Sequence, residues 1–252
     1  MLKIGFIGAG KMAQALAKGF IRGGLSKGEM MLASCLPNDV GSIDAFKEIG
    51  SNTVFSNAPV VDYGDVLILA VKPQVVPMVL PDLKNYRKLL LSIAMGIPLA
   101  SLEKAVPNGT PVIRVMPNTP AIVGCGATVY ARGKHAGDKE AKIAEKLFSS
   151  VGLCEEVPEN LIDPVTALAG SGPAYVCNKN LIYFQTFILM FIIEDEYRNI
   201  FFINVGIYDD RSFGRWRRKN GSYETNRVYA SCTNSSWCWY YGSRYENTSR
   251  TT

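Results

Sequence analysis

The first residues whose spacing suits a chemical task are Gly8, Gly10 and Ala13, near the start of a chain of 252 residues. They form the pattern Gly-x-Gly-x-x-Ala between an apolar segment and a helix-forming one. Gly8 would permit a tight turn, Gly10 would let a phosphate approach the backbone, and Ala13 would let helix and strand pack closely. Free N–H groups at the start of the helix would attract an anion. The spacing predicts a dinucleotide-binding loop, although a plain glycine-rich turn would have the same letters.

Ser34 is the second candidate, at the end of the apolar segment Met30–Ser34. Folds that prefer NAD usually place an acidic residue here to bind the ribose 2′-hydroxyl. The nearest acid in this chain is Asp39, several residues further on. Because a hydroxyl accepts a 2′-phosphate that a carboxylate would repel, we predict NADP as the cofactor, with NAD still possible. The alternative is that Ser34 is an ordinary turn residue.

Lys72 and Pro73 follow the apolar segment Val66–Val71. The proline stiffens the backbone where the segment ends, and the lysine offers a cation to a ribose or phosphate group. A lysine that is simply solvated in a loop is the alternative interpretation.

Asn118 and Thr119 lie between two prolines, so an amide and a hydroxyl are presented by a stiff loop. A stiff turn without a chemical role is equally consistent with these residues. His135, the only histidine, lies in a polar segment. We interpret it as a surface residue and not as a general base.

The elements that must position these loops alternate between strand-like and helix-like segments up to about residue 157. The expected strands are Lys3–Ile7, Met30–Ser34, Val66–Val71, Leu89–Ile93 and Val112–Met116, and the expected helical segments include Ile43–Ile49, Val75–Leu83, Leu99–Ala105 and Lys139–Ser150. This alternation predicts an α/β fold with a Rossmann-like, doubly wound, mostly parallel sheet. Ligand loops of such a sheet follow the carboxyl ends of its strands, which is where the polar loops fall.

Composition narrows the range of partners. Hydrophobic residues make up 48% of the chain and charged residues 19%, with a net charge of +5. No basic cluster indicates nucleic acid, and the six scattered cysteines form no Cys-x-x-Cys pair, so we expect neither nucleic acid nor a metal. The most apolar segment, Leu181–Ile193, is shorter than the roughly 20 residues that cross a bilayer, so we expect no membrane partner. Without a leader before the first strand, the expected location is cytoplasmic.

Several segments together resemble the pyrroline-5-carboxylate reductases, continuously from residue 1 to Val176. They are FIGAGKMAQALAKGF, ASC, LAVKPQ, SIAMGI, RVMPNTPAIVGCGATVYA and LIDPVTALAGSGPAYV. The resemblance implies reduction of 1-pyrroline-5-carboxylate to L-proline by NAD(P)H, the last step of proline synthesis. It implies an NAD(P)-binding domain over residues 1–157 and the start of an all-helical dimerisation domain over 158–176, in a family of homo-oligomers.

The resemblance also assigns roles to residues. Asn118 and Thr119 would be the catalytic residues, in a loop that closes the reaction pocket around the small substrate. Ser34 would face the adenosine ribose or its phosphate. The full set of residues implied to bind the cofactor is Ile7, Gly8, Ala9, Gly10, Lys11, Met12, Ser34, Asn57, Ala70, Val71, Lys72, Pro73, Ala94, Met95 and Gly96.

The chemistry of an imine agrees with the side chains that the sequence offers. A cyclic imine protonates readily, so hydride transfer to it demands orientation and electrostatics more than a tuned acid. A ketone or alcohol dehydrogenase would require a proton donor, for which we find no good candidate. The alternatives are another small β-hydroxyacid-type dehydrogenase and a non-catalytic NADP-binding remnant.

After Val176 the sequence departs from the family. Residues 177–252 contain 17 aromatic residues, against nine in residues 1–176. We interpret 177–206 as a retained intron and the remainder as a family exon read in a shifted frame; the alternative is a diverged tail with its own role. On this interpretation the helical dimerisation domain and its usual interface are missing, or replaced by an aberrant tail that we expect to be disordered. We therefore expect this chain to have little or no reductase activity.

Overall fold

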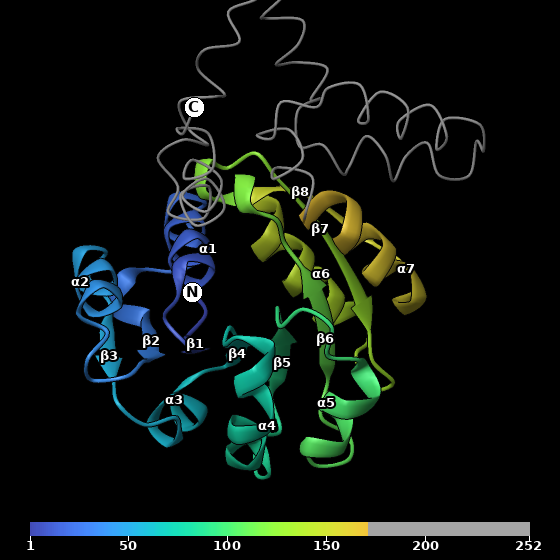
Figure 1. Ribbon diagram of the computed structural model, residues 1–252, viewed down its shortest axis with the longest axis horizontal. Helices are drawn as coiled ribbons and strands as arrows, with labels where there is room; N and C mark the ends of the chain where they lie inside the picture. The colour runs from blue at the N-terminus through green and yellow to red at the C-terminus, as the bar shows by residue number, and fades with distance from the viewer. Residues whose placement is uncertain (171–252) are drawn as a thin grey trace, which may run out of the picture. The chain divides into compact units, whose positions relative to one another are not determined.

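The computed structural model describes residues 1–170, which form an eight-stranded sheet flanked by helices (Figure 1). The aberrant tail predicted for 177–252 lies outside the described residues, as does the end of the predicted 158–176 segment. The strands are β1 (Ile4–Ile7), β2 (Met31–Ser34), β3 (Asn52–Val54), β4 (Val66–Leu69), β5 (Leu89–Ser92), β6 (Val112–Met116), β7 (Gly126–Arg132) and β8 (Gly152–Glu156).

The order of the strands, β3-β2-β1-β4-β5-β6-β7-β8, is that of a doubly wound sheet. Every neighbouring pair is parallel except β6 and β7. β1, β4 and β5 are buried along their whole length, as expected of apolar strands covered on both faces. The sheet changes winding direction between β1 and β4, and this switch point is where such folds bind ligands. The predicted fold class is confirmed for the described residues.

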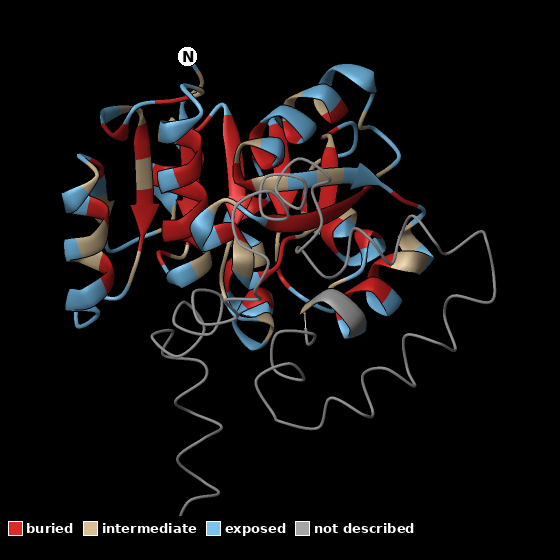
Figure 2. Ribbon diagram, turned by 90° about the horizontal axis from the view of Figure 1, so that it is seen from above, coloured by how far each residue is buried: buried red, intermediate tan, exposed pale blue. Residues whose placement is uncertain are grey.

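Helices cover both faces of the sheet (Figures 1 and 2). One face carries α1 (Lys11–Arg22), α2 (Val40–Glu48) and α6 (Asp138–Phe148), and the other carries α3 (Ala58–Tyr63), α4 (Val76–Val79), α5 (Leu99–Ala105) and α7 (Glu159–Val165). On the first face Phe6, Phe20 and Phe148 are fully buried, with Phe20 and Phe148 packed edge to face at a centroid distance of 6.2 Å. This aromatic contact fixes α1 and α6 against the sheet.

Two sequence expectations need correction. The helical segment predicted over Val75–Leu83 is broken into the 3-10 turn η2 (Pro73–Val75), the short helix α4 and the 3-10 turn η3 (Leu80–Leu83). Pro77 and Pro81 lie within this segment and deprive it of backbone donors. The strands β3, β7 and β8 were not expected, and β7 is the antiparallel exception. Within residues 1–170, no helix combines the length and apolarity needed to cross a membrane.

Candidate functional site

The glycine loop after β1 has the geometry of an open anion site. Gly8 has φ +97°, and a side chain there would bring its Cβ to 2.8 Å from the carbonyl oxygen of Ala70. Gly10 is exposed, caps α1 without a side-chain hydrogen bond, and has open space where a Cβ would stand. The first turn of α1 contains no acidic residue. Since the first N–H groups of a helix lack partners within it, this end of α1 suits an anion.

Ser34 holds the glycine loop from the end of β2. The Gly8 N–H donates to the Ser34 carbonyl oxygen at 3.1 Å and to its hydroxyl oxygen at 3.3 Å. The hydroxyl donates in turn to the carbonyl oxygen of Phe6 at 3.5 Å, and the residue is buried. In this structure the hydroxyl therefore points into the sheet edge, between Gly8 and Phe6, because backbone partners are available there. Its contact with the ribose or its phosphate stays a prediction.

Gln14, which the sequence analysis did not select, supports the same loop from α1. Its side chain is buried, and its amide Nε2 donates to the Ala9 carbonyl oxygen at 2.9 Å and to the Ser42 hydroxyl at 3.4 Å. Ser42 lies in the first turn of α2, where its backbone N–H donates to the Asp39 carboxylate at 3.2 Å. Gln14 thus connects the glycine loop with the start of α2.

The loop after β4 lies next to the glycine loop. The Ala70 N–H donates to the Ile7 carbonyl oxygen at 2.8 Å, which keeps the two strand ends together. Lys72 is exposed and comes directly before Pro73, the first residue of η2. Asn57, at the start of α3, donates from its amide to the Asp82 carboxylate at 2.8 Å.

The loops after β5 and β6 present the remaining predicted residues. Ala94 is buried, whereas Met95 and Gly96 are exposed. Asn118 is 4% exposed, and its side-chain oxygen accepts a hydrogen bond of 2.8 Å from the backbone N–H of Ala127 in β7. Thr119 is exposed at the start of the 3-10 turn η4 (Thr119–Val123). The amide of Asn118 therefore fastens its own loop to β7 and leaves Thr119 facing solvent.

The structure brings the predicted site residues to one edge of the sheet. Ile7 is in register with both Ser34 and Leu69, and Leu69 with Ser92, so the loops after these strands are neighbours. The loop after β6 is three strand spacings from the glycine loop, about 14 Å. An extended ligand could contact both. The roles predicted for the individual residues stay predictions.

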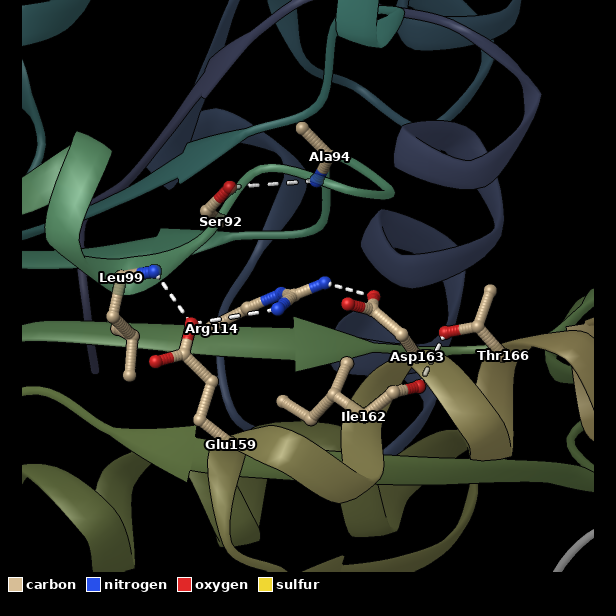
Figure 3. A network of polar contacts seen from close by, with 8 residues as sticks. All are labelled: Ser92, Ala94, Leu99, Arg114, Glu159, Ile162, Asp163 and Thr166. Carbon is tan, nitrogen blue, oxygen red and sulfur yellow. Dashed lines mark hydrogen bonds and ion pairs between the residues drawn. The ribbon is translucent and has the colours of Figure 1, made fainter.

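A buried arginine was missed by the sequence analysis (Figure 3). The Arg114 side chain in β6 is 4% exposed and pairs with two carboxylates of α7, those of Glu159 and Asp163. Glu159 Oε1 also accepts a hydrogen bond of 2.6 Å from the backbone N–H of Leu99, the first residue of α5. The signal in the sequence was a charge inside the apolar strand Val112–Met116, because a buried charge requires partners.

The Cys35 thiol, directly after β2, does not favour thiolate chemistry. Burial raises the pKa of the Cys35 thiol, and the nearby Asp39 charge adds to the rise. His135 is exposed, as expected, and its Nε2 lies 2.9 Å from the Asn108 side-chain oxygen. Among the described residues, no group of three or more His, Cys, Asp or Glu is placed to hold a metal ion.

A hollow of about 410 Å³ lies elsewhere, lined by Ala131, Arg132, Glu156, Val157, Pro158 and Glu159. Arg132 ends β7 and is in register with Ile113, near the start of β6, so this hollow is away from the loop that follows Met116. Its arginine is already paired with Glu156 and Asp138. We do not assign this hollow to the candidate site.

A glycine loop at the switch point of a doubly wound sheet, followed by an uncapped helix, defines a dinucleotide-binding domain of the Rossmann class. Residues 3–96 match a family described as NADP oxidoreductase, coenzyme F420-dependent. Pyrroline-5-carboxylate reductase 2 of Rattus norvegicus is 44% identical over 180 residues, covering 69% of this chain and 56% of that protein. The pyrroline-5-carboxylate reductase of Methanosarcina acetivorans is 43% identical over 185 residues, covering 69% and 65%.

Two solved structures of pyrroline carboxylate reductases are also similar to this chain. Plasmodium falciparum pyrroline carboxylate reductase with NADP bound has a TM-score of 0.64 and 28% identity, over 88% of this chain and 80% of that one. The Coxiella burnetii pyrroline-5-carboxylate reductase has a TM-score of 0.66 and 25% identity, over 96% and 88%. The chain is a pyrroline-5-carboxylate reductase-like protein, which confirms the resemblance stated from its motifs. It spans 56% to 65% of the length of the two curated relatives.

Proposed function

We propose that this chain carries the cofactor-binding part of a reductase that uses NADPH to convert 1-pyrroline-5-carboxylate into L-proline. The observation that supports this most is the open helix end at Gly10, on the same sheet edge as the stiff Asn118 loop. The relatives named pyrroline-5-carboxylate reductase, and the NADP bound to the Plasmodium falciparum structure, support the substrate and the cofactor.

The described residues fit a dinucleotide. The pyrophosphate would lie against the backbone between Gly8 and Ala13, because Gly10 leaves the space open and the start of α1 favours negative charge. The adenosine end would lie toward Ser34 and the nicotinamide end toward Ala94–Gly96 and Asn118, with Lys72 between them. When bound, NADPH would supply the hydride.

The chain's own contribution would be orientation. The Asn118 oxygen is engaged by the Ala127 N–H, so substrate contacts in this loop would fall to the Asn118 amide nitrogen and the exposed Thr119 hydroxyl. A protonated cyclic imine accepts hydride without a side-chain acid, so the reaction demands orientation of the substrate more than a tuned proton donor. Asn118 and Thr119 are therefore proposed to position the substrate.

A second candidate is a cofactor-binding remnant without turnover. The residues after 176 depart from the family pattern. We propose that this chain binds NADPH and has little or no reductase activity.

The test uses the full chain in two assays. Binding of NADPH is measured by titration calorimetry, and turnover by the oxidation of NADPH in the presence of 1-pyrroline-5-carboxylate. We expect binding without appreciable turnover. Turnover at an ordinary enzyme rate would show that the chain is a competent reductase, and failure to bind NADPH would overturn the proposed function. Sequencing the transcript across the codon for Val176 would decide whether the tail is encoded as written.

A further inference from the structure

The segment between β5 and α5, residues 93–98, is held at both ends by side chains. At its start, Ser92 Oγ accepts a hydrogen bond of 3.4 Å from the Ala94 N–H. At its end, Glu159 Oε1 accepts one of 2.6 Å from the Leu99 N–H. The residues between them include the exposed Met95 and Gly96. Two side-chain acceptors therefore fix where this loop leaves the sheet and where it enters α5.

The Glu159 contact replaces a missing helix cap. Pro98 precedes α5 and makes no side-chain cap hydrogen bond, so the first N–H groups of the helix need partners from elsewhere. A carboxylate at this end also interacts favourably with the helix dipole. Glu159 comes from α7, 60 residues along the chain, so it joins two separate elements.

Arg114 fixes the orientation of Glu159. Its guanidinium Nη1 lies 3.4 Å from Glu159 Oε1, the same oxygen that the Leu99 N–H contacts. Arg114 is in register with Ser92 on the neighbouring strand, so both ends of the loop are tied to adjacent positions of the sheet. The guanidinium is buried, so each of its two carboxylate partners, Glu159 and Asp163, offsets part of the cost of burying the charge.

We propose that Glu159, oriented by Arg114, is a positioning residue for the loop Ala94–Gly96. This rests on the proposed function, in which that loop contacts the nicotinamide end of the cofactor. Figure 3 shows the chain of contacts, from Arg114 through Glu159 to the backbone of Leu99, with Ser92 and Ala94 at the other end of the loop. Because Glu159 is the first residue of α7, a displacement of that helix would be transmitted to the loop.

Hydrogen exchange of the full chain without ligand tests the positioning itself. Glu159→Ala removes the acceptor, and the backbone amides of residues 93–97 and 99 should exchange about tenfold faster, since a hydrogen bond to a charged group is lost. Asp163→Ala is the matched control, because Asp163 also pairs with Arg114 but has no hydrogen bond to Leu99. Faster exchange confined to residues 93–99 in Glu159→Ala supports the proposal. Unchanged exchange there, or equal change in Asp163→Ala, overturns it.

Binding of two probes tests the functional consequence. Glu159→Ala should weaken NADPH binding about tenfold and leave binding of 2′,5′-ADP, which has no nicotinamide end, within about twofold. Glu159→Gln should restore NADPH binding, because a glutamine oxygen can also accept from the Leu99 N–H. Equal loss for both probes would indicate general damage and would overturn the proposal. If the unaltered chain bound neither probe, the proposed function would fail, while exchange would still decide whether Glu159 positions the loop.

Discussion

The Gly8 N–H is shared between two oxygens of Ser34, its carbonyl at 3.1 Å and its hydroxyl at 3.3 Å. The glycine loop and the end of β2 therefore form one hydrogen-bonded unit. Ser34, which we selected for a predicted contact with a ribose, is therefore also part of the frame of the glycine loop.

Ser34→Ala separates these two roles. The carbonyl bond to Gly8 remains, so we expect the unfolding free energy to fall by only about 1 kcal/mol. If the hydroxyl acts through the loop, affinities for NADPH and NADH should fall by the same factor. A loss confined to NADPH would instead assign the hydroxyl directly to the 2′-phosphate. Calorimetric titration with both cofactors distinguishes the outcomes.

The two loop glycines should respond differently to alanine. Gly8→Ala places a Cβ near the Ala70 carbonyl oxygen at a positive φ, so we expect a stability loss of about 1–3 kcal/mol. Gly10→Ala meets open space, so its melting temperature should be unchanged while NADPH binding weakens. Thermal unfolding and NADPH titration are measured on both. Unimpaired binding by a folded Gly10→Ala chain would contradict the placement of the pyrophosphate.

Asn118 should matter for the stability of the described domain. Asn118→Ala leaves the buried Ala127 N–H without its acceptor, which should cost about 1–3 kcal/mol in urea unfolding. Asn118→Asp retains an acceptor and should recover part of that stability. A stable Asn118→Ala chain would show that this hydrogen bond does not hold the loop.

Lys72 is expected to contribute a screened attraction to the cofactor. Lys72→Gln should weaken NADPH binding roughly fivefold in dilute buffer and less as salt is added, because the lysine is exposed. Lys84→Gln is the matched control, an exposed lysine in the same β4–β5 connection. Equal effects of the two substitutions on NADPH binding would show that Lys72 does not contact the cofactor.

Alkaline pH should destabilise the described domain. Burial raises the pKa of the Cys154 thiol from 9.0 to about 12, with Glu145 adding to the rise. The unfolded thiol ionises first, so this stability is fully present below pH 9.0 and is lost as the pH rises toward 12. Cys154→Ala should flatten the decline by up to about 1 kcal/mol per pH unit. Urea unfolding at several pH values measures this loss of stability. Cys125→Ala is the control, because Cys125 is exposed.

The sequence was most informative where one local pattern determines structure. The apolar run Val66–Leu69 forms a buried strand, and the spacing of Gly8 and Gly10 alone predicted the turn that they form. β3 has three residues and β8 is mostly exposed, so neither shows an apolar run. The pairing of Arg114 with Glu159 joins residues 45 apart, and only the placement of α7 against the sheet creates it.

The same distinction applies within the site. The positions of Lys72 and Asn118 at strand ends followed from the alternation of elements. The direction of the Ser34 hydroxyl did not, because it depends on which backbone groups of β1 are within reach. Gln14 was not predicted for a related reason. A glutamine in an amphipathic helix is expected on the surface, and only the packing of α1 shows that this one is buried.

The two outer strands of the described sheet also affect how copies of this domain can meet. β3 offers only three residues for pairing, and β8 carries Glu155 and Glu156, both exposed. Short or charged edge strands discourage edge-to-edge aggregation, because a second strand would gain few hydrogen bonds or would bring like charges together. Such edges disfavour the joining of the sheet of one domain to that of a neighbour.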